Sequence, residues 1–268
     1  MRIKISDGCC RISSESKLEY LLLNSNYLKS KLAYSELRPN SDNFGEIEFN
    51  RNKPFLFDLG ENKFNFNIDE ESKVGYLLRI IVDSMSVNVG NLPLHSAYAE
   101  VNQLGIFLFG DMYGGKSSTL ISLKDLDGIK LIGDDHILIG GKKISGNLMS
   151  RIRTQQGESF FPLEGSSKKI DTNIIFNLFP SNINSFKYQK KDEYLEDGNS
   201  LDAVLKYLNR NPIFNGIKYD LSNIVGKPII EKYFSLFRNF VFESEFIVKV
   251  SGEHEYIKEK VREVIENK

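Results

Sequence analysis

Hydrophobic and polar residues alternate in three short segments before residue 70, which is the pattern of half-buried strands. These segments are GEIEFN (45–50), PFLFDL (54–59) and KFNFNI (63–68). Asp69 then precedes a stretch with apolar residues at helical spacing, and its side chain can cap a helix over 70–85. We therefore expect residues 1–90 to form a mixed α+β region that packs on a larger domain, residues 91–268.

The pattern changes in the second region, where continuous apolar runs replace alternation. LGIFLF (104–109) has the length and composition of a strand buried on both faces of a sheet. A glycine-rich stretch follows it, then a predicted helix (116–126) and a second buried strand (129–135) that ends in two aspartates. Strand, loop, helix and strand predict a βαβ unit, so the loop and the aspartates should meet at one carboxyl edge of the sheet.

The remaining segments complete an α/β fold. We predict a hairpin over 136–145, an exposed polar excursion over 184–200, a helix over 228–240, a strand over 245–250 and a closing amphipathic helix over 253–268. The apolar face of the last helix is predicted to consist of Tyr256, Val261, Val264 and Ile265.

Composition narrows the class of protein. The chain has 268 residues, 41% of them hydrophobic and 26% charged, which is typical of a protein that forms a core. A net charge of −1 argues against binding nucleic acid through bulk charge. The chain has no apolar run long enough for a membrane span, and its first residues are charged where a signal peptide is apolar. Adjacent Cys9 and Cys10 fit reduced thiols, so we expect a cytoplasmic protein that contacts neither nucleic acid nor membrane.

The stretch GDMYGGKSS (110–118) carries the first candidate chemistry. Gly110, Gly115, Lys116 and Ser117 match G-x-x-x-x-G-K-[ST], in which glycines let backbone N–H groups point at phosphate oxygens. Lys116 would reach the outer phosphates, and the Ser117 hydroxyl would bind Mg²⁺. The alternative is a glycine-rich turn that only caps a helix. The predicted nucleotide contacts are Gly110, Asp111, Met112, Tyr113, Gly114, Gly115, Lys116, Ser117 and Ser118.

Asp134 and Asp135 carry the second candidate chemistry. Side chains of neighbouring strand residues point to opposite sides, so the two carboxylates can serve different partners. One can hold Mg²⁺ while the other accepts the proton of an attacking hydroxyl. The residues alone leave open which aspartate is the base, and a polar strand end in a tight turn is the alternative.

Residues 92–139 together resemble the HPr kinase family, whose core is similar to ATP-dependent phosphoenolpyruvate carboxykinase. The likeness is carried by LPLHSAYAEVNQLGIFLFGDMYGGKSSTLISL and LIGDDHILI. It implies a P-loop kinase core that uses ATP and Mg²⁺ to phosphorylate a hydroxyl, often that of serine. Carried over residue by residue, Lys116 and Ser117 bind the phosphates and the metal, and Asp134 and Asp135 are the base and a metal ligand. We take Asp134 as the base and Asp135 as the ligand. His95 would lie beside them as a catalytic residue, with a structural hydrogen-bond partner as the alternative.

The chain departs from the family pattern at three places. Tyr113 stands where the family loop has glycine, and Ser118 stands where an acidic residue is common. SRIRTQQGESFFP (150–162) replaces a glycine-rich signature. Alternation puts Arg151 and Arg153 on one strand face, where Arg153 is a candidate for stabilising the transferred phosphate. Exposed surface arginines are the alternative.

These departures weaken HPr as the substrate and favour the divergent relatives associated with peptide tailoring. The leading hypothesis is therefore a kinase of serine in a peptide or small protein. Two alternatives stay open: a kinase of a small-molecule hydroxyl, such as an amino acid or sugar, and a nucleotide-binding regulatory module without catalysis. The family also suggests a homo-oligomer.

Overall fold

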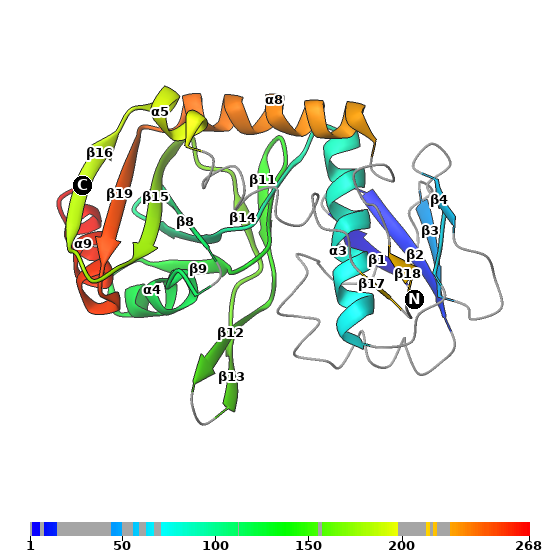
Figure 1. Ribbon diagram of the computed structural model, residues 1–268, viewed down its shortest axis with the longest axis horizontal. Coiled ribbons are helices and arrows are strands. Elements are labelled where there is room, and N and C mark those ends of the chain that lie inside the picture. Colours follow the sequence, from blue (N-terminus) through cyan, green and yellow to red (C-terminus); the bar gives the residue numbers. More distant parts are fainter. Residues whose placement is uncertain are drawn as a thin grey trace.

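The computed structural model describes residues 2–5, 8–14, 44–49, 56–58, 63–66, 71–111, 113–154, 157–197, 213–214, 217–218 and 226–268. Side chains are described for residues 79–111, 113–152, 157–197 and 226–268. The fold is mixed α/β, as the sequence predicts (Figure 1). In the part of the chain that the structure describes, every helix is too short or too polar to cross a membrane.

A six-stranded mixed sheet forms the centre of the molecule. Its strand order is β16 (Ser185–Gln189), β19 (Phe246–Gly252), β15 (Thr172–Pro180), β8 (Leu104–Gly110), β7 (Ala97–Val101) and β9 (Lys130–Gly133). β8, β15 and β19 pair in parallel, and every residue of β8 is buried. The predicted strands over 104–109, 129–135 and 245–250 are confirmed.

The strand, loop, helix and strand of the predicted βαβ unit follow in the predicted order, but the two strands are not neighbours in the sheet. β8 leads through a loop into α4 (Lys116–Ser122) and a short 3₁₀ turn, η1 (Leu123–Asp125), before β9 begins. β7 lies between β8 and β9 and pairs antiparallel with both. β8 and β9 consequently run in the same direction, so the loop after Gly110 and the aspartates after Gly133 lie at the same edge of the sheet.

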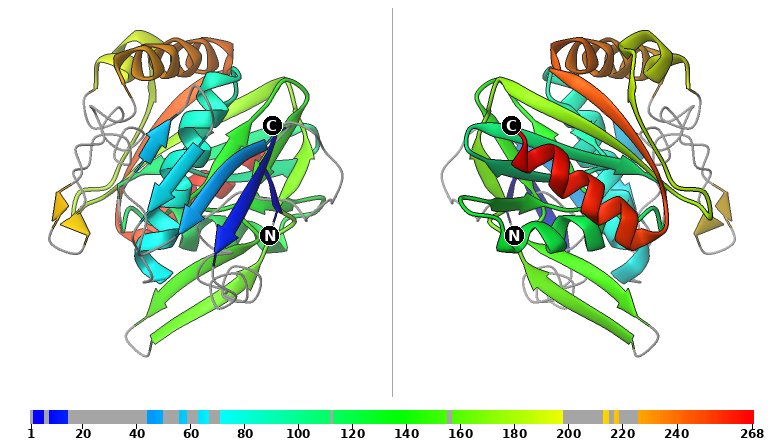
Figure 2. Two further views of the ribbon diagram at one scale, coloured as in Figure 1. Left: turned by 90° about the vertical axis from the view of Figure 1, so that its right-hand side faces the viewer. Right: turned by 90° about the vertical axis from the view of Figure 1, so that its left-hand side faces the viewer.

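Helices cover both faces of the central sheet (Figure 2). Ile106 and Leu108 of β8 belong to a cluster with α4 and with α9 (His254–Glu266). Phe107 and Phe109 point to the other face, where they meet aromatic residues of α8 (Lys227–Glu243). Because successive side chains of β8 point to opposite faces and both faces are covered, every position of the run is buried and apolar. Burial of each side chain of this size contributes about 1.5–3 kcal/mol to the stability of the fold.

A second sheet contributes to the same edge. It has the order β14 (Ser166–Lys168), β11 (Lys143–Gly146), β10 (Ile137–Ile139) and β6 (Leu92–Leu94). The predicted hairpin over 136–145 is confirmed, with the Gly140 amide donating to the Lys143 carbonyl at its turn. A separate hairpin of β12 (Met149–Thr154) and β13 (Gly157–Pro162) projects from the molecule (Figure 1).

The N-terminal strands form a sheet of their own. Its order is β1 (Arg2–Ile5), β2 (Gly8–Ser14), β3 (Phe44–Phe49), β5 (Lys63–Phe66) and β4 (Leu56–Asp58). α3 (Glu71–Asn88) stands between this sheet and the central one (Figure 1). The three predicted strands and the helix are confirmed, while the domain boundary at residue 90 stays a prediction. Two short strands, β17 (Ile213–Phe214) and β18 (Ile217–Lys218), pair with each other.

Two features differ from the sequence interpretation. The predicted excursion over 184–200 contains β16, an exposed edge strand, and α5 (Lys191–Glu196), while residues 198–200 lie outside the described part. α5 is ordered by Tyr194, which is fully buried against Phe109 and Phe237. In α9, Val261, Val264 and Ile265 are buried as predicted, but Ile257 is buried in place of Tyr256, which is only half-buried, because Ile257 lies one helical turn (i, i+4) before Val261.

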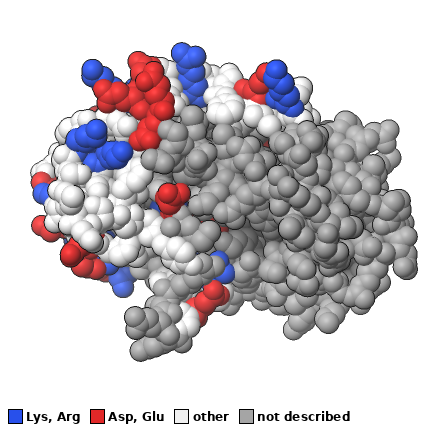
Figure 3. All heavy atoms as spheres, viewed as in Figure 1, with Lys and Arg blue, Asp and Glu red and all other residues white. Residues whose placement is uncertain are grey.

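Acidic and basic side chains are interspersed over α5 and α8 on the face seen in Figure 3. α8 itself begins at Lys227, with a proline in its first turn, and the predicted helix over 228–240 is confirmed. On this face of the described residues, neither sign of charge gathers into a single patch.

Candidate functional site

The loop between β8 and α4 has an unusual backbone. Tyr113 and Gly115 both adopt the left-handed conformation, at φ +66° and +82°, and the Gly114 amide donates to the Asp111 carbonyl at 2.9 Å. A Cβ at Gly115 would lie 2.9 Å from Nδ1 of His254, at the start of α9. Glycine is therefore favoured there by conformation, and a larger residue would also have to displace the exposed His254 side chain. Tyr113 is 70% exposed, and Met112 lies outside the described residues.

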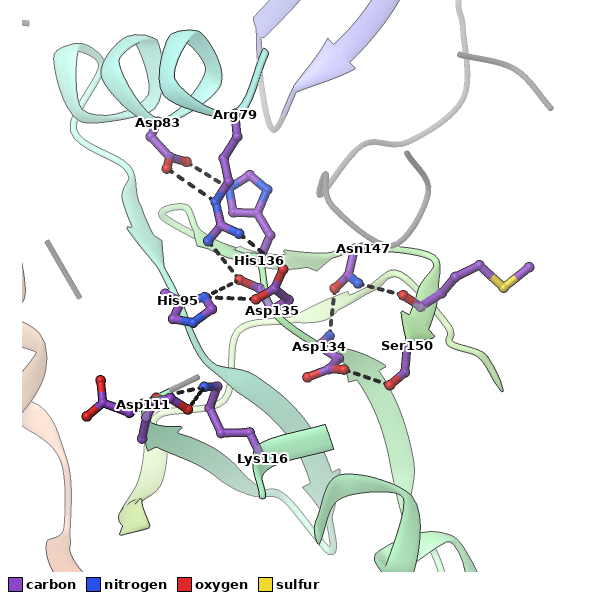
Figure 4. Close-up of polar contacts among 12 residues, drawn as sticks. Arg79, Asp83, His95, Asp111, Lys116, Asp134, Asp135, His136, Asn147 and Ser150 are labelled. Carbon is purple, nitrogen blue, oxygen red and sulfur yellow. Dashed lines mark hydrogen bonds and ion pairs between the residues drawn. The ribbon is translucent and has the colours of Figure 1, made fainter. Parts of the chain in front are cut away.

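Lys116 is turned back over this loop. Its ammonium donates hydrogen bonds to the carbonyl oxygens of Gly110 at 2.7 Å and Asp111 at 3.0 Å, and the residue is only 7% exposed. The Ser118 hydroxyl donates to the Gly115 carbonyl at 2.9 Å, so it stabilises the loop from within. The charge of Lys116 is thus held at the mouth of the loop by its own backbone (Figure 4).

Asp134 lies directly after β9, where two glycine backbones approach closely. A Cβ at Gly133 would lie 2.6 Å from Cα of Gly146, so the pair can pack only as glycines. This approach brings Asn147 to the Asp134 backbone, whose amide donates to Asn147 Oδ1 at 2.6 Å. Ser150, at the base of the projecting hairpin, donates to Asp134 Oδ2 at 2.6 Å.

The other carboxylate oxygen of Asp134, Oδ1, is buried and has no hydrogen-bond partner. Burial raises the pKa of Asp134, and the charge of Asp135 raises it further. The hydrogen bond from Ser150, the nearby hydroxyl of Ser117 and the charge of Lys116 act in the opposite direction but are outweighed. The residue is only 2% exposed, so Asp134 is a carboxyl with enhanced proton affinity beside the lysine of the loop.

Asp135 adopts a left-handed conformation, at φ +73°, which is uncommon for a residue other than glycine. Nδ1 of His95 lies 3.0 Å from both the carbonyl oxygen and Oδ1 of Asp135. Arg79 of α3 donates to the same carbonyl at 2.7 Å and pairs with Oδ2 at 3.5 Å. The backbone and the carboxylate of Asp135 are therefore both held by nitrogen groups (Figure 4).

The histidine beside this aspartate is neutral. Burial lowers the pKa of His95 to about 4, although Asp135 acts to raise it. Because both nearby atoms are acceptors, Nδ1 carries the proton and Nε2 is left as an acceptor. His95 thus lies beside the aspartates, as the resemblance implies.

The sequence interpretation missed several residues of this cluster. Arg79 also pairs with Asp83 one helical turn later, and His136 donates from Nε2 to Asp83 Oδ1 at 2.7 Å. An arginine inside the apolar run YLLRIIV was a signal, since a charged side chain is rarely buried without a partner. Asn147 and Ser150 gave no comparable signal.

The predicted arginines, Arg151 and Arg153, belong to β12 of the projecting hairpin. Arg151 reaches Glu158 across the β12–β13 hairpin, with 3.4 Å between Nη1 and Oε1. The backbone of Arg153 lies in β12, but its side chain lies outside the described part, so its catalytic role stays a prediction. Within the described residues, His, Cys, Asp and Glu side chains form no group of three that could hold a metal ion alone.

Comparison with known proteins gives little beyond this geometry. No protein-family model matches the chain. No curated protein sequence matches it either. Among solved structures, the chain is similar to the HPr(Ser) kinase/phosphatase from Coxiella burnetii, with 13% identity and a TM-score of 0.31 over 65% of this chain and 94% of that one. The proposed function therefore depends on the residues of the site.

Proposed function

We propose that this chain is an ATP- and Mg²⁺-dependent phosphotransferase that transfers the γ-phosphate to a hydroxyl. Our preferred acceptor is a serine of a peptide or small protein. One observation carries the proposal: the buried carboxylate of Asp134, with Oδ1 unpartnered, lies at the same sheet edge as the glycine-rich loop and Lys116. In this proposal a carboxylate that can accept a proton and a lysine that can bind phosphate share one site.

The binding half of the proposal rests on the loop. Lys116 at present donates to two carbonyl oxygens of its own loop, and these are weaker acceptors than phosphate oxygens. When a triphosphate binds, Lys116 would give up these two hydrogen bonds and donate charge-assisted hydrogen bonds to phosphate oxygens instead. The left-handed conformations of Tyr113 and Gly115 curl the loop backbone, and a curl of this kind would let loop N–H groups face a bound anion.

The donor set at this edge fits Mg²⁺. The Ser117 hydroxyl and the carboxylates of Asp134 and Asp135 are hard oxygen ligands, which this ion prefers. Asp135 raises the pKa of Asp134, and a divalent cation would relieve that repulsion. We assign Ser117 and Asp135 to the ion, completed by phosphate oxygens and water. When bound, Mg²⁺ would neutralise charge on the β- and γ-phosphates.

In this proposal Asp134 is the general base that takes the proton from the hydroxyl of the acceptor. Its raised pKa suits a general base, and Oδ1 is available while Ser150 holds Oδ2. As the acceptor oxygen bonds to the γ-phosphorus, the bond from that phosphorus to the β,γ-bridging oxygen breaks and ADP leaves. Asp134 takes the hydroxyl proton and later releases it to solvent. Lys116 stabilises negative charge on the phosphates throughout.

The same features weigh against the regulatory alternative. A module that only binds nucleotide has no use for a buried carboxylate of enhanced proton affinity, which is costly to keep without a partner. The choice between a serine and a small-molecule hydroxyl depends on the resemblance to the HPr kinase family, and the test is designed to separate the two acceptors.

The test follows label from [γ-³²P]ATP with Mg²⁺ and extract of the source cell. Wild type is compared with Lys116→Ala, and Lys124→Ala is the matched control because Lys124 is exposed in η1. We expect label on serine in the peptide or protein fraction, lost in Lys116→Ala and retained in Lys124→Ala. Label in the small-molecule fraction would favour the metabolite kinase. ATP binding with no transfer to any fraction would overturn the proposal.

A further inference from the structure

α3 holds two consecutive residues of the site through one pair of side chains. Arg79 and Asp83 are spaced i, i+4 on this helix and pair at 3.7 Å. Arg79 contacts Asp135 and Asp83 contacts His136, so the dipeptide after Asp134 is held from a helix that precedes it by about fifty residues. All of these contacts are buried or nearly so, with Arg79 2% and His136 0% exposed.

The contacts made by Arg79 hold the left-handed backbone of Asp135 as well as its negatively charged carboxylate. A left-handed conformation is less favourable for an aspartate than an ordinary backbone conformation, so contacts from elsewhere in the fold must hold it. Arg79 donates 2.7 Å to the carbonyl of Asp135 and lies 3.5 Å from its Oδ2. His95 supplies the other contact to that carbonyl. A guanidinium can satisfy both oxygens from one planar group, which the ammonium of lysine cannot.

We propose that Arg79, oriented by Asp83, is a positioning residue for the candidate active site: it sets the backbone of Asp135, and thereby the direction of the Asp135 carboxylate. This inference rests on the proposed function, because it assigns Asp135 to the metal and Asp134 to the proton. It also gives α3, which the sequence placed in the N-terminal region, a direct part in the site.

The test separates an effect of Arg79 on the position of Asp135 from effects on folding and on nucleotide binding. The variants are Arg79→Lys, Arg79→Met and Asp83→Asn. Arg262→Met is the matched control, since Arg262 forms an exposed i, i+4 pair with Glu266 on α9. Arg79→Met removes a cation that contacts the carboxylates of Asp83 and Asp135, and this variant can fail to fold. Arg79→Lys and Asp83→Asn, which keep the volume, then decide the outcome.

Three readouts are compared for each folded variant. Hydrogen exchange of the backbone over residues 133–137 reports the local conformation without metal or nucleotide. Binding of a fluorescent ATP analogue in EDTA reports the loop, and Mn²⁺ affinity with ADP, followed by electron paramagnetic resonance, reports the carboxylates. We expect exchange at least tenfold faster, metal affinity at least tenfold weaker, kcat lowered at least tenfold and metal-free nucleotide binding within threefold of wild type.

The outcomes distinguish this inference from the proposed function. Unchanged exchange and unchanged Mn²⁺ affinity in Arg79→Lys and Asp83→Asn would overturn the positioning role, even with an active wild type. Equal loss in Arg262→Met would overturn it as well. If the wild type binds no Mn²⁺ with ADP and transfers no phosphate, the proposed function fails, and the role of Arg79 in fixing Asp135 is still decided by the exchange measurement.

Discussion

The Ser150 hydroxyl donates a 2.6 Å hydrogen bond to Oδ2 of Asp134, from the base of a hairpin to the end of a strand in another sheet. This contact fixes which oxygen of the carboxylate is left over. Because Ser150 occupies Oδ2, the unpartnered oxygen that can receive a proton is Oδ1.

Ser150→Ala should therefore impair transfer while sparing nucleotide binding. A hydrogen bond to a charged group is worth about 1.5–3 kcal/mol, and part of that holds the orientation of Asp134. We expect kcat to fall about tenfold with the Kd of ATP within twofold, measured by steady-state transfer and by calorimetry. Ser122→Ala is the control, because Ser122 donates only to the Thr119 carbonyl within α4. A kcat within twofold of wild type would contradict the role given to Ser150.

The two aspartates should respond differently to amide substitution. Asp134→Asn removes the proton acceptor, so transfer should fall by about 10²–10⁴ while Mg²⁺·ATP binds as before, as for loss of a general base. Asp135→Asn removes a ligand charge, so the concentration of Mg²⁺ needed for half-maximal activity should rise at least tenfold. Steady-state transfer at several Mg²⁺ concentrations measures both activities, and calorimetry of ATP binding checks that the nucleotide still binds. The reverse pattern would exchange the two roles.

The loop and the aspartates were predictable because their chemistry is local in sequence. Gly110 to Ser117 form one motif, and Asp134 and Asp135 follow an apolar strand at a spacing that a crossover helix can bridge. The apolar runs also made the main buried strands predictable, because a strand such as β8, which is buried on both faces, needs apolar residues at every position. Those parts of the fold follow from short-range patterns of hydrophobicity.

The support around the aspartates was not predictable in the same way. Arg79 lies 56 positions before Asp135 and meets it only through packing of α3 on β6 and α8. Ser150 and Asn147 are common residues whose roles depend on the close approach of Gly133 and Gly146. The position of β7 between β8 and β9 is likewise a result of strand pairing, which composition does not encode.

Gly115 should not tolerate a side chain. Its φ of +82° costs an alanine about 1–2 kcal/mol, and the new Cβ would meet His254 Nδ1 at 2.9 Å. We expect Gly115→Ala to weaken ATP binding at least tenfold and to lower the melting temperature by a few degrees. Adding His254→Ala should relieve only the crowding of the new Cβ and not the backbone strain. The double variant should therefore bind ATP more weakly than His254→Ala alone. Gly141→Ala is the control, since its Cβ would meet no atom within 4 Å. Full recovery in the double variant would mean that crowding, rather than conformation, requires the glycine.

The buried histidine predicts how stability depends on pH. The pKa of His95 is lowered to about 4 in the folded protein, whereas an unfolded histidine titrates near 6.5. Below pH 6.5 the unfolded chain therefore binds a proton that the folded chain does not, and the free energy of unfolding falls as the pH falls toward 4. The loss from this residue is on the order of 3 kcal/mol, because each pKa unit is worth about 1.4 kcal/mol.

Urea unfolding in EDTA at pH 7.5, 6.5, 5.5 and 4.5 measures this dependence. His95→Asn keeps a donor near the position of Nδ1 but does not titrate, so its stability should decline less steeply between pH 6.5 and 4.5. His136, whose pKa burial also lowers, retains its own share of the slope in that variant. The comparison variant is His254→Asn, which makes the same substitution at an exposed histidine at the start of α9. If His95→Asn and wild type lose stability in parallel, His95 is not the neutral donor to Asp135 that the geometry assigns.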